Sequence, residues 1–456
     1  MRSLIFGLAL ALGLLIIALP AAGQQDAFDL HAAMAAAQPG DTIRVPAGVY
    51  PGPLVITQAV TLIGEGWPVI AGTGKGDVIT VEAADVTLRG FVIRNSGISL
   101  DRENAGLTGL APRLTIEESR FEDVLFGIYL KQAHDSVIRG NTILSKDLDI
   151  ARRGDGIRLW YSSNVLVESN LVSGSRDVIM WFSSDCTVRD NIVENGRYGL
   201  HFMYSDNQVI EHNILRDNSV GIYLMYSRDL LLRQNLLTGN NGPSGYGVGV
   251  KDVDNLHATG NRMVGNRVGI YIDNSPRDPA ATLLAERNLV AYNQIGLEIQ
   301  PLTKRNTYTH NVFLENGEQV ALTTGGQLSG NHWSREGQGN FWSDYAGFDA
   351  DGNQIGDIPY KSQSLYESLM ATYPELRLFQ LSPASDALDM AAKAFPLFQP
   401  KPRMADEHPL MAPPTLPEVP GLTPPPTLAN LLLALVLLAL ALFILAFGTG
   451  NVMRKT

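Results

Sequence analysis

The sequence predicts an all-β fold, a right-handed parallel β-helix built from coils of about 22 residues. One observation is an asparagine that returns at intervals of 21 to 29 residues. Another is a short alternating block in each repeat that begins with glycine, as in GIRLWY at Gly156 and GIYLMY at Gly221. No helix-length amphipathic segment interrupts the repeats, so stacked short strands account for the pattern. The repeating asparagines are Asn141, Asn170, Asn191, Asn213, Asn235, Asn261, Asn288 and Asn311.

The chain begins with the features of a secretory signal. A positive charge precedes an apolar run from Leu4 to Leu19, and small residues follow up to Gly23. This pattern predicts a signal peptide at residues 1–23, with an uncleaved N-terminal membrane anchor as the alternative. Residues 24–59 hold an Ala-rich, helix-prone stretch and the first strands. We expect that helix to cap the first coil, because an open coil presents unpaired strand edges.

Residues 60–330 form the coils, and the alternation within each block sets which side chains face outward. The apolar members should face the interior. One outward column then reads Trp160, Trp181, Met203, Met225, Lys251 and Asp273. Its neighbour reads Arg158, Ile179, His201, Tyr223, Gly249, Tyr271 and Glu298.

The asparagine column is expected to be structural, with side chains hydrogen-bonded to one another and to the main chain along the turns. Cys186 is the only cysteine, so no intramolecular disulfide can form. It shares its position in the repeat with Val165 and Leu230. That position predicts a buried thiol.

The C-terminal quarter differs in composition from the coils. Aromatic-rich residues 331–395 are expected to close the last coil, and eleven prolines between residues 396 and 426 predict an extended tether over 396–427. Residues 428–447 are apolar and uncharged, which predicts a single transmembrane helix rather than a buried core helix. Arg454 and Lys455 in the tail, residues 448–456, place that tail in the cytoplasm.

Two blocks outside the coils carry a resemblance to a known family. The opening PGDTIRVPAGVYPGPLVI, the closing NFWSDYAGFDADGNQIGDIPY, the GI-x-x-x-S coils and the C-terminal anchor together resemble the NosD family. The resemblance implies a periplasmic subunit, anchored in the inner membrane, of the ABC complex that matures nitrous oxide reductase. It also implies a membrane permease, a cytoplasmic ABC-type ATPase, a copper chaperone and nitrous oxide reductase as partners. The chain would dock partners and deliver copper, and would not itself be an enzyme.

A copper site can be sought on the outward columns. His201 and Met203 lie two apart on one strand and so share a face, and Met225 lies one coil away. Imidazole and thioether ligands suit Cu(I), which would be bound transiently. The alternative is a hydrophobic docking face without metal. The residues of that face would be Trp160, Trp181 and Tyr223.

Two further metal sites are predicted near the C-terminus. The tether contains a second set of soft ligands for copper, Met404, His408 and Met411. Oxygen side chains at alternate positions of one loop suit a structural Ca²⁺, and a polar turn held by those same side chains is the alternative. The loop residues are Asp349, Asp351, Asn353 and Asp357.

Composition and motifs also bear on other function classes. A formal net charge of −11 leaves no basic patch for phosphates, which argues against a nucleic-acid partner. The main rival is a membrane-anchored, carbohydrate-active β-helix enzyme, a polysaccharide lyase, hydrolase or epimerase. The outward Trp160, Trp181 and Tyr223 would stack on sugars, and Arg153, Asp155 and Arg158 would supply acid–base groups. Against that rival, the sequence has no obvious paired-carboxylate motif repeated on neighbouring coils.

Overall fold

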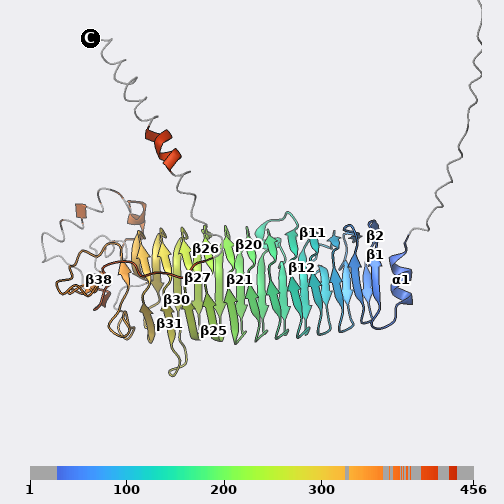
Figure 1. Cartoon of the computed structure of the whole chain (residues 1–456), viewed down its shortest axis with the longest axis horizontal. Coiled ribbons are helices and arrows are strands. Elements are labelled where there is room, and N and C mark those ends of the chain that lie inside the picture. The colour runs from blue at the N-terminus through green and yellow to red at the C-terminus, as the bar shows by residue number, and fades with distance from the viewer. Residues whose placement is uncertain are drawn as a thin grey trace, which may run out of the picture.

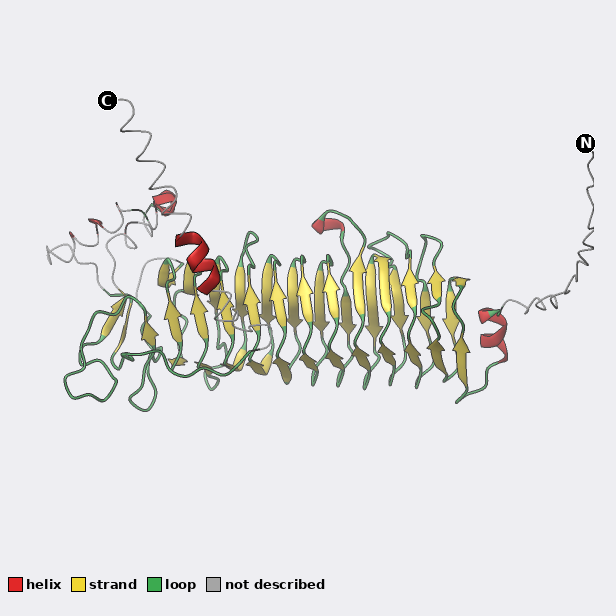
Figure 2. Cartoon of the chain, turned by 45° about the horizontal axis from the view of Figure 1, so that its top comes forward, coloured by secondary structure: helices red, strands yellow, loops and turns green. Residues whose placement is uncertain are grey.

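The computed structural model is a long rod of stacked coils, a right-handed parallel β-helix (Figure 1). The structure describes residues 28–323, 328–362, 373–379, 402–419 and 431–438, with a few single residues between 363 and 391. Each coil contributes one strand to each of three parallel sheets, A, B and C. The strands lie across the axis of the rod and stack along its whole length, and loops collect along its edges (Figure 2). The predicted fold class is confirmed.

Sheet A has 12 strands, and each strand after the first follows the turn that leaves sheet C. Its strands are β1 (Thr42–Val45), β4 (Thr61–Gly64), β7 (Thr87–Arg89), β10 (Thr115–Glu117), β13 (Val137–Arg139), β16 (Leu166–Glu168), β19 (Thr187–Arg189), β22 (Gln208–Glu211), β25 (Arg228–Arg233), β28 (Asp254–Thr259), β31 (Leu283–Glu286) and β34 (Asn306–Thr309).

Sheet B has 13 strands, because a short strand after the last coil adds to its end. Its strands are β2 (Val49–Pro51), β5 (Val69–Ala71), β8 (Val92–Arg94), β11 (Arg120–Val124), β14 (Thr142–Ser145), β17 (Leu171–Ser173), β20 (Ile192–Glu194), β23 (Ile214–Arg216), β26 (Leu236–Thr238), β29 (Arg262–Val264), β32 (Leu289–Ala291), β35 (Val312–Leu314) and β37 (Phe341–Trp342).

Sheet C has 12 strands and carries the glycine-led blocks of the sequence. Its strands are β3 (Leu54–Ile56), β6 (Ile79–Val81), β9 (Ala105–Gly109), β12 (Phe126–Lys131), β15 (Ile157–Trp160), β18 (Asp177–Trp181), β21 (Tyr198–Met203), β24 (Val220–Met225), β27 (Tyr246–Lys251), β30 (Val268–Asp273), β33 (Ile295–Ile299) and β36 (Glu318–Leu322).

The pairing register within sheet C confirms both predicted outward columns. Trp160 pairs with Trp181, Trp181 with Met203, and Met203 with Met225. The alternate positions fill a single apolar core that runs through the rod. The predicted interior residues Ile157, Leu159, Val178, Met180, Leu200, Phe202, Ile222 and Leu224 all belong to it.

Helix α1 (Leu30–Ala36) lies at the N-terminal end of the rod (Figure 1). Asp29 caps it, because its carboxylate accepts a hydrogen bond from the main-chain N–H of Ala32 at 3.0 Å. Leu30 and Met34 are buried and join the core of the coils. In the described part of the chain, 3-10 helix η1 (Ile150–Arg152) lies between β14 and β15, and η2 (Pro374–Phe379) follows β38.

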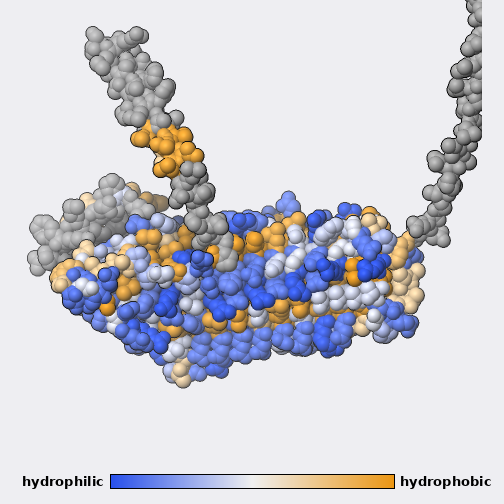
Figure 3. All heavy atoms as spheres, in the orientation of Figure 1, coloured by the Kyte–Doolittle hydropathy of each residue, from blue (hydrophilic) through white to orange (hydrophobic). Residues whose placement is uncertain are grey.

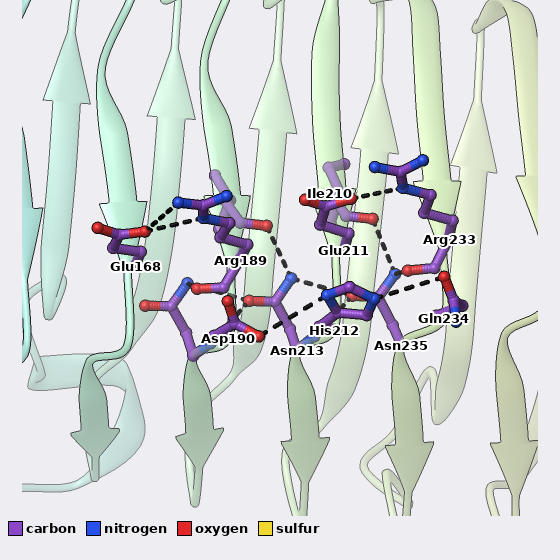
Figure 4. A network of polar contacts seen from close by, with 12 residues as sticks. Glu168, Arg189, Asp190, Ile210, Glu211, His212, Asn213, Arg233, Gln234 and Asn235 are labelled. Atoms are coloured by element: carbon purple, nitrogen blue, oxygen red, sulfur yellow. Dashed lines mark hydrogen bonds and ion pairs between the residues drawn. The ribbon is translucent and has the colours of Figure 1, made fainter. Parts of the chain in front are cut away.

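The asparagine column forms the predicted ladder (Figure 4). The side-chain oxygen of Asn213 accepts hydrogen bonds from the main-chain and side-chain N–H of Asn191, both at 3.0 Å. Its amide nitrogen donates to the carbonyl oxygen of Val188 at 2.9 Å. A second, unpredicted ladder runs parallel to the first, five residues later in the sequence of each coil. Its members are Asn218, Asn240, Asn266, Asn293 and Asn316.

Beside the asparagine ladder, charges of alternate sign follow the outer face of sheet A (Figure 4). Arg189 pairs in register with Glu168 and Glu211, and its guanidinium donates to Glu168 at 2.8 Å. The guanidinium of Arg233 likewise donates to Glu211. These contacts link successive coils and are structural.

The described part of the predicted tether packs against the rod. Residues 402–419, which we name the strap, contain β39 (Met404–Asp406), which pairs antiparallel with β38 (Tyr360–Ser362). The strap then runs back to earlier coils, where the carbonyl oxygens of Pro417 and Glu418 accept hydrogen bonds from Arg262 and Gln234. Part of the predicted extended tether therefore contacts the coils, and the tether over residues 396–427 as a whole stays a prediction. Prolines lack an N–H but keep their carbonyl oxygens as acceptors, and the apolar side chains between them find burial sites on the coils.

The predicted signal peptide and the cytoplasmic tail lie outside the described residues, as does most of the predicted membrane span. Within that span, residues 431–438 are helical and exposed, with Leu431 at 59%. Across the described parts of the chain, no helix is both long enough and apolar enough to span a membrane.

Candidate functional site

The outer face of sheet C presents an unusual run of large side chains on four successive coils. Trp160, Trp181, Met203 and Met225 form one column and are half-buried. A second column lies directly beside it, at the turn that leaves the sheet. We name the two columns together the aromatic–methionine face. Its residues are Trp160, Tyr161, Trp181, Phe182, Met203, Tyr204, Met225 and Tyr226. Figure 3 shows apolar residues (orange) gathered in bands along the rod between polar ones.

The second column is a stacked aromatic ladder that the sequence reasoning missed. Ring centroids of Tyr161, Phe182, Tyr204 and Tyr226 lie 4.8, 5.0 and 4.9 Å apart in turn, with planes within 13° of parallel. Tyr161 and Tyr204 are 45% and 44% exposed. The two inner rings have both faces covered by neighbours, so they offer solvent their edges. The signal in the sequence was the second letter of the dipeptides WY, WF, MY and MY.

The ladder occupies backbone positions that are unfavourable for such residues. Phe182 and Tyr204 have φ of 51° and 53°, in the left-handed region. Bulky side chains are rare there, whereas Asn and Asp are tolerated. The same turn position holds Gln132, Asp252 and Asn274 in flanking coils. Aromatic residues at this position therefore bring strain that the fold does not need, which points to a role in recognition.

Beside this face, toward the start of the sheet C strands, a network of charges with two buried carboxylates links three coils. Asp155 lies 3.3 Å from the Nε of Arg176 and 3.6 Å from the Nη1 of Arg158. Arg197 donates to both oxygens of Asp177, which has no exposed surface. Asp155 and Asp177 therefore form a carboxylate pair on neighbouring coils. The pair was not evident from the sequence because Asp155 lies two residues before Ile157, whereas Asp177 lies one residue before Val178, the register partner of Ile157.

The two carboxyls have opposite pKa shifts. Burial, followed by the nearby negative charge of Asp177, raises the pKa of Asp155 to about 7. Burial alone would also raise the pKa of Asp177. Hydrogen bonds with His201 and Arg197 instead hold the pKa of Asp177 below the usual range of an aspartate.

His201 belongs to this network. Its Nδ1 lies 3.3 Å from an oxygen of Asp177, and its buried Nε2 has no hydrogen-bond partner among the described residues. The rings of Tyr198 and Tyr223 pack against it, with centroids 5.0 and 6.3 Å away. His201 points outward as predicted but is only 6% exposed, so the expected surface imidazole is in fact buried. The flanking tyrosines and the carboxylate of Asp177 contact the imidazole of His201, which explains why it is buried although it points outward.

The second predicted copper set lies on the strap, where its three side chains differ in exposure, and it stays a prediction. Met404 is buried in the core, whereas His408 is exposed and Met411 half-buried. Among the residues that the structure describes, no cluster of three or more His, Cys, Asp or Glu side chains has the geometry for a metal ion.

The predicted calcium loop is hydrogen-bonded to itself. Asp349 accepts from the main-chain N–H of Gly352 at 2.7 Å and of Gln354 at 2.8 Å. Asp351 accepts from the side-chain amide of Asn353 at 2.9 Å, and Asp357 from the main-chain N–H of Ala350 at 2.6 Å. This arrangement matches the polar-turn alternative.

The acid–base groups named for a carbohydrate enzyme are only partly brought together. Asp155 and Arg158 meet in the buried network. Arg153 instead donates to the carbonyl oxygens of Leu148 and Asn195, where it fastens a loop.

Comparisons with known proteins agree on one family. The family model described as "Periplasmic copper-binding protein (NosD)" matches residues 143–347. A "Probable ABC transporter binding protein NosD" from Stutzerimonas stutzeri is 32% identical over 393 residues, 82% of this chain and 87% of the relative. The protein of the same name from Pseudomonas aeruginosa is 33% identical over 384 residues, 80% and 87% of the two chains.

Solved structures share the fold at low identity. The A-module of the Azotobacter vinelandii mannuronan C-5 epimerase AlgE6 is 17% identical, with a TM-score of 0.51, over 67% of this chain and 93% of that one. The catalytic unit of an α-1,3-glucanase from Streptomyces thermodiastaticus is 17% identical, with a TM-score of 0.53, over 70% and 66%. These likenesses show the β-helix alone.

Proposed function

Because this chain belongs to the NosD family, we propose that it is a periplasmic copper-binding protein that works with an ABC transporter. It would receive Cu(I) from a chaperone and dock the apo form of nitrous oxide reductase during maturation. A permease and a cytoplasmic ATPase would complete the complex, and ATP would be hydrolysed by that partner. Residues 428–447 would anchor the chain in the inner membrane.

The aromatic–methionine face is the proposed docking surface for partner proteins. Tyrosine, tryptophan and methionine are enriched at the cores of protein interfaces. The left-handed backbone of Phe182 and Tyr204 supports this assignment, because flanking coils use polar residues at the same turn position. Trp160, Trp181 and Tyr223 were the docking residues expected from the sequence, and the ladder extends that surface.

The proposed copper site consists of His201, Met203 and Met225. The observation that carries it is the register: Met203 pairs with Met225 across adjacent coils, and His201 lies two residues before Met203 on the same strand. The Nε2 of His201 makes no hydrogen bond within the described structure, so this nitrogen is available to bind a ligand. Thioethers and imidazole form a donor set suited to Cu(I) in the absence of cysteine.

Copper titration tests the proposal. The full-length protein would be titrated anaerobically with Cu(I) against a competing chelator, alongside His201→Ala and a Met203→Leu, Met225→Leu double variant. We expect one tight equivalent that both variants lose. The matched control is Met263→Leu, a buried methionine of β29 that belongs to neither copper set, which should bind as the wild type does. Unchanged stoichiometry in the face variants would place copper elsewhere and leave the face as a docking surface.

The carbohydrate-active alternative has one observation in its favour, the buried pair Asp155 and Asp177 with His201 beside it. The covered ring faces of Phe182 and Tyr204 oppose it, because a sugar stacks on the face of a ring rather than its edge. Release of unsaturated or epimerised products from uronic-acid polymers, lost in Asp177→Asn, would select this alternative.

A further inference from the structure

We infer that Asp177, held by Arg197, positions His201 for copper by keeping the ring proton on Nδ1 and leaving Nε2 to face the metal. This inference rests on the proposed copper site, whose ligands did not include Asp177. It assigns Asp177 a positioning role behind the metal rather than a place among the ligands.

The geometry around Asp177 leaves its carboxylate one orientation. Arg197 donates from Nε to one oxygen at 2.9 Å and from Nη2 to the other at 2.5 Å. The second oxygen also faces the Nδ1 of His201 at 3.3 Å. An ionised carboxylate only accepts hydrogen bonds, so Nδ1 must carry a proton to make this contact. In the neutral imidazole, Nε2 is then the unprotonated nitrogen with its lone pair free.

A β-bulge brings the two residues into contact. Asp177 pairs with Tyr198 and Ile179 pairs with His201, so two residues of β21 lie opposite the single Val178 of β18. The preceding pair of strands, β15 and β18, keeps an unbroken register. Bulges re-aim side chains and are over-represented near functional sites. Here the extra residue sets His201 diagonally across from Asp177.

The Nε2 of His201 independently indicates a ligand at this position. The side chain is 8% exposed, and Nε2 is a buried polar atom without a hydrogen-bond partner in the described structure. A buried polar group without a partner destabilises the fold, so the retention of this one points to a ligand. Histidines that bind metals nearly always donate their other ring N–H to a carboxylate or carbonyl. The pair Asp177 and His201 has that arrangement.

Two measurements on the full-length protein test the inference. The first is the ¹⁵N NMR spectrum of the histidines without metal, with His201 assigned from His201→Ala. We expect the Nδ1–H tautomer for His201 in the wild type and its loss in Asp177→Asn. The second is Cu(I) affinity by chelator competition, which Asp177→Asn should lower by roughly 10- to 100-fold. The matched control is Asp190→Asn, because Asp190 faces the Nδ1 of His212 at 3.8 Å in a half-exposed pair; its affinity should not change.

The outcomes separate this inference from the proposed site. Copper binding that survives His201→Ala would refute the site itself. Binding that is lost in His201→Ala but unchanged in Asp177→Asn, or an Nε2–H tautomer in the wild type, would overturn the positioning role alone. If Asp177→Asn does not fold, Arg197→Gln replaces it: a wild-type tautomer and affinity in that variant would overturn the role, and a loss of both would support it.

Discussion

Replacing Asp406 with alanine should release the strap from the last coil. The Asp406 carboxylate is fully buried and ends the asparagine ladder, since it accepts the main-chain N–H of Asn340 at 2.8 Å. It also accepts the indole N–H of Trp342 at 3.0 Å and the main-chain N–H of His408 at 3.1 Å. This one side chain therefore joins the strap to the closing coil.

The magnitude follows from the donors that alanine would leave without a partner. The main-chain N–H of Asn340 and the indole N–H of Trp342 are both buried, and each unpaired donor costs about 1–3 kcal/mol. The sum, about 4 kcal/mol, corresponds to a roughly thousand-fold rise in the fraction of molecules with the strap detached. Burial raises the pKa of Asp406, so Asp406→Asn should have a smaller effect than alanine.

Hydrogen exchange read by mass spectrometry measures this directly. Peptides that cover β38 and β39 should exchange faster in Asp406→Ala, while peptides from the central coils should not change. The matched control is Glu407→Ala, because Glu407 neighbours Asp406 on the strap and is exposed. Equal protection of β39 in Asp406→Ala and the wild type would refute the reasoning and show that apolar burial alone holds the strap.

Three further predictions concern the coils. Asn213→Ala should lower the free energy of unfolding by about 2–4 kcal/mol, because it leaves the buried N–H of Asn191 and the carbonyl of Val188 without these partners. A loss below about 1 kcal/mol in chemical denaturation would contradict a stabilising role of the ladder. The pKa of Asp155, about 7 in the fold, lies above the 3.8 of an ordinary aspartate. The contribution of this carboxyl to the free energy of unfolding is therefore full at low pH and is lost as pH rises through about 7. Between about pH 4 and pH 8, the stability of Asp155→Asn should rise relative to the wild type by up to about 4 kcal/mol. A stability difference that does not change with pH would be inconsistent with this prediction. Burial raises the pKa of the Cys186 thiol to about 12, so iodoacetamide should label it only after unfolding, as intact mass would report.

Much of the fold was predictable because it depends on a period. Once one asparagine in each repeat is aligned, the two-residue alternation of a strand sets every inward and outward position. The column from Trp160 to Asp273 and the burial of Cys186 were both correct for that reason. The second asparagine ladder obeys the same period and was visible in the sequence five residues after the first.

The site was less predictable, because its chemistry depends on departures from the period. The bulge in β21 moves His201 against Asp177. The interval between repeats rises from 21 residues (Asn170 to Asn191) to 22 (Asn191 to Asn213), but a repeat length alone does not say where the extra residue lies. An outward direction was taken to mean exposure, yet tyrosines on neighbouring coils bury His201. Composition indicated an extended tether but not where it contacts the coils, because its hydrogen bonds with Gln234 and Arg262 join segments more than 150 residues apart.

X-ray absorption at the copper edge tests the central claim most directly. The full-length protein would be loaded with one equivalent of Cu(I), and the nearest-neighbour shell compared with that of the Met203→Leu, Met225→Leu double variant. We predict one imidazole nitrogen and two thioether sulfurs in the wild type, with the sulfur contribution absent from the variant. A shell of nitrogen and oxygen only, or the same sulfur contribution in both proteins, would contradict a copper site at His201, Met203 and Met225.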